Sequence, residues 1–101
     1  MDTRLTAANP ALPLATVTDF NPNIPPEITR EKRSLSLYGH RTSVALETPF
    51  WAVLEGTAKA QDMSLAGLLC KLDDARIAAR SELGLAAYLR VWAIVQLKGK
   101  A

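Results

Sequence analysis

The segment that most constrains the fold is Arg41–Leu46, which alternates polar and apolar residues and runs directly into Glu47–Trp51. Alternation with a period of two predicts a half-buried β-strand. Thr48 followed by Pro49 fits the N-cap and first position of an α-helix, so a strand and a helix follow one another without a loop. A strand this short is not stable alone, and its simplest partner is the same strand of a second copy of the chain.

A second alternating segment, Ser34–Tyr38, precedes the first. Its apolar residues fall at odd positions, whereas those of Arg41–Leu46 fall at even positions, so the phase changes across Gly39–His40. This change requires either a bulge or a two-residue turn, and glycine in the first central position favours a type II′ hairpin. The facing pairs of that hairpin are then Tyr38 with Arg41, Leu37 with Thr42, Ser36 with Ser43, and Leu35 with Val44. Opposed residues share a face of the hairpin. The residues that then point inward are Leu35, Leu37, Val44 and Leu46. Those that point outward are Ser34, Ser36, Tyr38, Arg41, Ser43 and Ala45.

Three amphipathic helices are expected after the strands. The first begins at the Thr48 cap and ends near Gln61, and the second begins after an N-cap at Ser64 and reaches about Arg80. The third begins near Gly84 or Leu85 and is apolar over much of its circumference, which predicts burial against the second helix or at a subunit interface. Its apolar positions are Leu85, Tyr88, Leu89, Val91, Trp92, Ile94 and Val95. The fold class is therefore mainly α with a short β-ribbon.

Proline divides the chain into two parts. Of its 6 prolines, all but Pro49 lie in Met1–Arg30. Proline removes a backbone donor and disfavours helix at the preceding residue, so residues 1–30 are expected to form an extended, mostly unstructured arm. Residues 31–101 are then the folded domain. Its small size favours oligomerisation, here as a homodimer.

The composition provides few of the side chains that enzymes use for catalysis. The 101 residues include 1 histidine and 1 cysteine, and the carboxylates show no spacing that brings them together. The glycines are dispersed rather than gathered in a phosphate-binding loop. We therefore expect no enzymatic activity, no cofactor and no metal site. The single cysteine, Cys70, fits a reducing compartment, and no apolar run approaches the length of a membrane span, so the cytoplasm is the expected location.

Nucleic-acid binding fits the strand pattern better, and the net charge of +2 permits it. The major groove of B-form DNA admits a two-stranded antiparallel ribbon whose outward side chains reach base edges. The candidate base contacts are Arg41, which can bond guanine, Ser43, which can donate or accept, and Ala45, which can touch a thymine methyl group. Backbone amides at the start of the second helix, at Ser64 and Leu65, are candidate phosphate contacts.

Several short motifs follow one another along the chain, namely Lys32-Arg33-Ser34, Gly39-His40-Arg41-Thr42-Ser43-Val44, Leu46-Glu47, Phe50-Trp51, Ser64-Leu65, Ala87 and Leu89-Arg90-Val91. Over about Glu31 to Leu97, this order resembles a bacterial family of short ribbon-helix-helix proteins. The resemblance implies an intertwined homodimer with an antiparallel ribbon, here with an extra C-terminal helix. It also implies transcriptional repression or antitoxin-like autoregulation.

Two further sets of residues complete this hypothesis. Because positive charge attracts phosphate, we expect Lys32, Arg33 and His40, which lie around the strands, to contact the DNA phosphates. The dimer interface is expected to include Val44, Leu46, Trp51, Leu68, Leu69, Leu72 and Trp92. The expected partners are double-stranded DNA and a second copy of the chain, with no membrane.

Two questions stay open at this point. If Ser34–Tyr38 remains paired beside the ribbon in both copies, the sheet has four strands and is about 14 Å across, against a major groove about 12 Å wide. The upstream strand then leaves when DNA binds, or pairs elsewhere, or the domain does something other than groove reading. The alternative function is a protein-interaction module, antitoxin-like or an adaptor, that holds a partner protein through the apolar third helix or the proline-rich arm.

Overall fold

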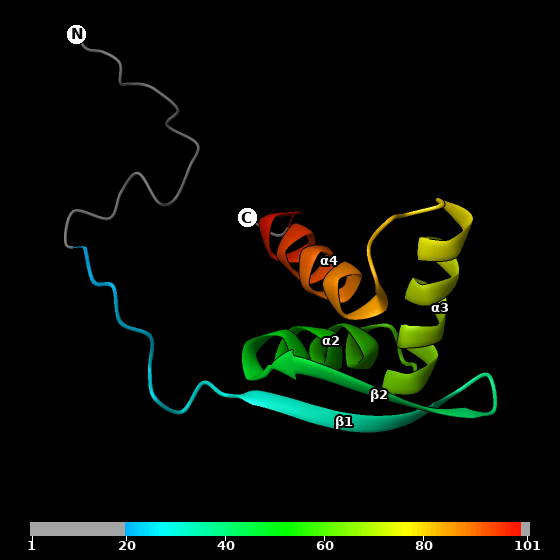
Figure 1. The fold of residues 1–101 in the computed structure, drawn as a ribbon, viewed down its shortest axis with the longest axis horizontal. Helices are drawn as coiled ribbons and strands as arrows, with labels where there is room; N and C mark the ends of the chain where they lie inside the picture. The colour runs from blue at the N-terminus through cyan, green and yellow to red at the C-terminus, as the bar shows by residue number, and fades with distance from the viewer. Residues whose placement is uncertain (1–19, 100–101) are drawn as a thin grey trace, which may run out of the picture.

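The structure is a computed structural model that describes residues 20–99. Its elements, in order, are β1 (Arg30–Leu37), β2 (His40–Glu47), α2 (Thr48–Ala60), α3 (Leu65–Ala78) and α4 (Leu85–Gly99). All three helices lie on one side of the two-stranded sheet (Figure 1). Most of the arm expected over residues 1–30 falls outside the described residues. Its described part, residues 20–29, contains no helix or strand and runs away from the helices.

The two strands form an antiparallel hairpin whose turn differs from the sequence prediction. The central turn residues are Tyr38 and Gly39, with φ angles of 55° and 79°, rather than Gly39 and His40. Two positive φ angles are typical of a type I′ turn. The observed partners are Leu37 with His40, Leu35 with Thr42, and Arg33 with Val44, so the predicted register is wrong by two residues.

The assignment of side chains to the two faces is confirmed in spite of that shift. A displacement of two residues preserves the alternation, because successive side chains of a strand point to opposite faces. Leu37, Val44 and Leu46 are buried, and Leu35 is partly buried against the same core. Tyr38 is the exception, since it lies in the turn rather than on the outer face.

The core lies between the inner face of the hairpin and the helices. Its largest fully buried side chains are Trp51, Leu46, Leu54, Leu69 and Leu89. The indole nitrogen of Trp51 donates a hydrogen bond to the backbone carbonyl of Glu31 at 2.8 Å, which fixes α2 against β1. This bond satisfies the one polar group of a residue that otherwise contributes apolar area.

The helix boundaries agree with the pattern except at the start of α2. Ser64 is the N-cap of α3, and its hydroxyl oxygen accepts the Gly67 amide at 2.9 Å, as predicted. At α2, however, the N-cap is Glu47, with no side-chain bond, and Thr48 is already helical. The Thr48 amide donates to the Thr29 carbonyl at 2.8 Å, so this residue extends the strand pairing instead of capping the helix.

Six of the seven residues predicted at a dimer interface are already buried within one protomer. The six are Val44, Leu46, Trp51, Leu68, Leu69 and Leu72, each at most 7% exposed. Only Trp92 is partly exposed. A hairpin folded back on its own helices covers these side chains without a second chain, so their burial gives no sign of an intertwined dimer.

Candidate nucleic-acid interface

The outer face of the hairpin, away from the helices, is polar at every position except Ala45. Its cross-strand pairs, from the turn outward, are Ser36 with Arg41, Ser34 with Ser43, Lys32 with Ala45, and Arg30 with Glu47. Every side chain of this set is exposed except Ala45 and Glu47, which are half-buried. We call these eight residues the outer face. Two predicted base contacts, Arg41 and Ser43, therefore lie adjacent to each other on it, together with Ala45.

The charge of the outer face is strongly unbalanced. It carries the cations Arg30, Lys32 and Arg41, and its one carboxylate is Glu47, at the end far from the turn. Glu47 accepts a bond from Arg90 of α4 at 2.8 Å, and this contact holds the pKa of the Glu47 carboxyl below its ordinary value. A face with three cations and one compensated carboxylate attracts a polyanion.

Arg33 was expected to contact phosphate, but it lies on the inner side of the hairpin. Its guanidinium pairs with Glu31 at 2.8 Å and with Glu55 of α2, and it sits 4.6 Å from the centroid of the Trp51 ring. These bonds raise the pKa of Arg33, with the hydrogen bond to Glu31 as the first cause. With Nε bonded to Glu31 and Nη1 bonded to Glu55, Arg33 stabilises the attachment of β1 to α2 and is not part of the outer face.

The other predicted phosphate contacts are dispersed. Lys32 is exposed on the outer face, whereas His40 is exposed beside the turn and shares the side of the hairpin on which Leu37 lies. The first amides of α3, at Leu65 and Ala66, have no acceptor within the described residues. Of the five predicted phosphate contacts, only Lys32 therefore lies on the outer face with the predicted base contacts.

Comparison with known families identifies this arrangement. A family model described as a ribbon-helix-helix domain matches residues 30–97, which is most of the chain and begins at the first residue of β1. The chain belongs to the ribbon-helix-helix domain family. No curated protein and no solved structure matched it. Membership suggests a DNA-binding regulatory or antitoxin-like role, since these domains are generally dimeric DNA-binding modules rather than enzymes.

The described part of the chain shows neither a membrane-spanning helix nor a metal-binding cluster. Within residues 20–99, no helix has the length and apolar character needed to cross a bilayer. The same part of the chain contains no cluster of three or more side chains suited to holding a metal ion.

The edge of β2 that does not pair with β1 lies beside α4. Arg90 donates through Nη2 to the Ala45 carbonyl at 3.2 Å, so this carbonyl points away from β1. A shallow groove of about 210 Å³ runs along this edge, lined mainly by β2 and by Leu85 and Ala86 of α4. Arg90 was missed as a functional residue, although it is the one charged residue among the apolar positions of Leu85–Leu97 and that isolation was a usable signal.

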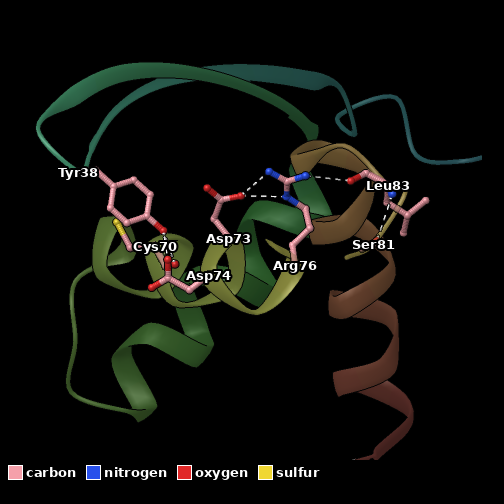
Figure 2. Close-up of polar contacts among 7 residues, drawn as sticks. All are labelled: Tyr38, Cys70, Asp73, Asp74, Arg76, Ser81 and Leu83. Carbon is pink, nitrogen blue, oxygen red and sulfur yellow. Dashed lines mark hydrogen bonds and ion pairs between the residues drawn. The ribbon is translucent and has the colours of Figure 1, made fainter. Parts of the chain in front are cut away.

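Hydrogen bonds connect the turn of the β1–β2 hairpin to α3 (Figure 2). The Tyr38 hydroxyl lies 2.9 Å from the Cys70 carbonyl oxygen and within hydrogen-bonding distance of the Asp74 carboxylate. Figure 2 also shows Arg76 of α3 bound to Asp73 at 2.9 Å and to the Leu83 carbonyl at 3.1 Å. The turn of the hairpin and the start of α4 are thus both fixed to α3.

Proposed function

We propose that this protein is a DNA-binding regulator that contacts the double helix through the outer face of its hairpin. The observation that carries the proposal is the charge and shape of that face. It is an extended polar ribbon with three exposed cations, and its one carboxylate is already paired with Arg90. A major groove is wide enough for such a ribbon and presents base edges to its side chains.

Each proposed DNA contact has a role set by its chemistry. Arg41 bonds the two acceptors of a guanine, Ser43 donates to or accepts from a base, and Ala45 contacts a thymine methyl group. Lys32 neutralises a phosphate, and the free amides that follow Ser64 are a second phosphate contact.

The regulator acts as a homodimer in this proposal. Family membership supports the dimer, because ribbon-helix-helix domains generally form dimers. Two copies around a twofold axis present two outer faces to a near-palindromic site, as dimeric DNA-binding proteins generally do.

A mobility-shift titration tests the proposal. Labelled fragments of genomic DNA from the source organism are titrated with the protein at several salt concentrations, and the bound fragments are recovered. We expect Arg41→Ala to weaken binding to the recovered fragments by about 10-fold or more, as loss of one bidentate base contact predicts. The matched control is Lys59→Ala, which removes an exposed positive charge from α2. Equal effects of the two substitutions would remove the hairpin from the recognition mechanism.

A second candidate function, a protein-interaction module, is favoured by one surface of α4. Val91, Ile94, Val95 and Leu97 are each about half exposed, between 48% and 55%. Exposed apolar side chains gathered on one element are typical of a protein-binding surface. Pull-down with wild-type protein, with Val91→Glu/Val95→Glu and with residues 1–28 removed, which keeps Thr29 and Arg30 of the hairpin, distinguishes the candidates. A DNA regulator keeps its DNA affinity in all three, whereas an interaction module loses its partner in at least one of the two variants.

A further inference from the structure

The edge of β2 that faces away from β1 has backbone groups without a partner strand. Along an antiparallel strand, alternate residues turn these groups toward the neighbouring strand and the others turn them away. Arg90 reaches the Ala45 carbonyl on the side away from β1, so the backbone groups of Ser43 and Arg41, two and four residues earlier, point the same way. Within residues 20–99 no strand pairs with them, and both residues are exposed. Such an edge is a template for another strand.

The same edge of a second copy is the natural strand to pair with it, since ribbon-helix-helix domains generally form dimers. A twofold axis perpendicular to the sheet keeps the helices of both copies on one face and makes the two β2 strands antiparallel. The start of β2 in one copy then lies beside the end of β2 in the other. Because β2 follows the turn at Tyr38 and Gly39 and ends at Glu47, each copy places its turn beside the Glu47 end of the other.

One row of α4 side chains begins at the β2 edge and continues past it. Residues three and four apart share a face of a helix, and this row is Ala86, Arg90, Ile94 and Leu97. The first two line the groove beside β2, and Arg90 is bonded to Glu47. Since α4 runs in the same direction as β2 (Figure 1), Ile94 and Leu97, about one and two turns farther on, lie past the end of the strand. Both are about half exposed, so the row ends in an uncovered apolar surface.

The hairpin turn also exposes apolar surface. Tyr38 is about half exposed, and its hydroxyl already lies within hydrogen-bonding distance of the Cys70 carbonyl and the Asp74 carboxylate of α3 (Figure 2). The one polar group of this side chain is therefore satisfied within its own chain. Apolar side chains can cover the rest of the ring without leaving a buried polar group unpaired.

We infer that α4 completes the dimer: Ile94 and Leu97 of each copy pack against the Tyr38 ring of the other copy. The contact forms twice around the twofold axis, at the two ends of the paired β2 strands. The inference rests on the homodimer of the proposed function and names the side chains that hold its two copies together beside the strands.

This contact supplies apolar area that the paired strands lack. Stable protein interfaces bury about 800 Å² on each partner, whereas two short strands joined edge to edge share mainly backbone hydrogen bonds. The largest apolar side chains beside the ribbon, such as Leu46 and Trp51, are already buried within one protomer. Association therefore depends on apolar side chains that are still exposed, and antiparallel pairing of β2 brings Ile94, Leu97 and Tyr38 together.

Sedimentation equilibrium without DNA tests the α4 side of the contact through the dimer dissociation constant. Ile94→Glu places a charge in the interface and should raise this constant by about 10-fold or more. Val95→Glu is the matched control, because Val95 is the next residue of α4, is also about half exposed and lies outside the row. It should change the constant by less than about two-fold. Equal effects of the two substitutions, or a wild-type chain that is monomeric at every concentration, would overturn the inference.

Tyr38→Asn tests the other side of the contact without weakening the turn. It removes the ring and leaves Asn-Gly, the dipeptide that type I′ turns favour, so the hairpin is kept. The dissociation constant should again rise by about 10-fold or more, and combining this change with Ile94→Glu should add little, because both remove one contact. An unchanged constant for Tyr38→Asn would overturn the inference.

DNA binding is measured separately, because none of these variants alters the outer face. If the variants dissociate as expected but neither they nor the wild type bind DNA, the proposed function fails while the α4 contact stands. If DNA binds and the dissociation constants do not change, the inference fails while the proposed function stands.

Discussion

The hydroxyl group of Tyr38, at the tip of the hairpin, donates a hydrogen bond to the carboxylate of Asp74 on α3. The hydroxyl has one proton, and the Cys70 carbonyl lies 2.9 Å from the same oxygen, so the two acceptors compete for it. A carboxylate is the stronger acceptor. Tyr38 has a positive φ of 55°, which residues other than Gly, Asn and Asp seldom adopt, and the bond to Asp74 offsets part of that conformational cost.

The bond to Asp74 raises the pKa of Tyr38 from 10.0 to about 12. Because the folded-state pKa lies above the unfolded value, the bond stabilises the fold fully below about pH 10, and this contribution is lost as the pH rises to about 12. In a Tyr88→Phe background, phenolate absorbance should titrate near pH 12, and Asp74→Asn should lower that midpoint. An unchanged midpoint in Asp74→Asn would show that the carboxylate does not hold the Tyr38 proton.

Gly39 is predicted to be the glycine least tolerant of alanine. Its φ is +79°, and no atom lies within 4 Å of an added Cβ, so the penalty is conformational rather than steric. Gly39→Ala should lower the free energy of unfolding by about 1 kcal/mol. Gly56→Ala, inside α2 and equally unobstructed, should raise it by about 0.5 kcal/mol. Urea titration of the two variants checks the opposite signs, and the same sign for both would refute the turn geometry.

The ion pair between Glu47 and Arg90 should make the stability difference between the wild type and an Arg90 variant depend on pH in the acid range. Arg90 holds the pKa of Glu47 below its ordinary value of 4.5, so the pair stabilises the fold above that value and ceases to do so as the pH falls through the folded-state pKa. Arg90→Gln should therefore be less stable than the wild type at pH 7, by an amount that shrinks below about pH 4. Urea midpoints measured from pH 3 to pH 7 test this, and a difference independent of pH would point to lost packing instead.

Neighbouring cations of β1 should behave in opposite ways. Lys32→Ala should weaken binding to all DNA sequences and reduce the slope of log affinity against log salt by about 1, with little change in stability. Arg33→Ala should cost about 1 kcal/mol of stability, because it removes the stacking on Trp51 and the ion pairs with Glu31 and Glu55. Paired unfolding and binding curves separate the two effects. A lower salt slope for Arg33→Ala would place its guanidinium on phosphate after all.

The sequence predicted the elements well because their signals are local. Two alternating segments, a proline after a threonine, and a serine N-cap at Ser64 each depend on residues a few positions apart. Two strands and three helices appear near these signals, although β1 begins at Arg30 rather than at the predicted Ser34, and the N-cap of α2 is Glu47 rather than Thr48. The inward positions of Leu37, Val44 and Leu46 were also predictable, since face follows from alternation alone.

What the sequence did not predict depends on contacts between distant segments. The register of the hairpin is set by a turn in which Tyr38 is bonded to Asp74, and no local pattern reveals a partner on α3. In the same way, Arg33 and Lys32 are adjacent and look alike in sequence. The structure separates them, because one side chain faces the Trp51 ring and the other faces away from the helices.

The hydrogen bonds between Thr29 and Thr48 make the two ends of the outer face different from each other. They hold the chain at the end of the hairpin opposite the turn, and the N-terminal segment departs from that point. One end of the hairpin is closed by Tyr38 and Gly39, whereas the other continues into the rest of the chain. In the proposed dimer on a near-palindromic site, the segments that directly precede Thr29 therefore leave their hairpins either both toward the dyad or both away from it.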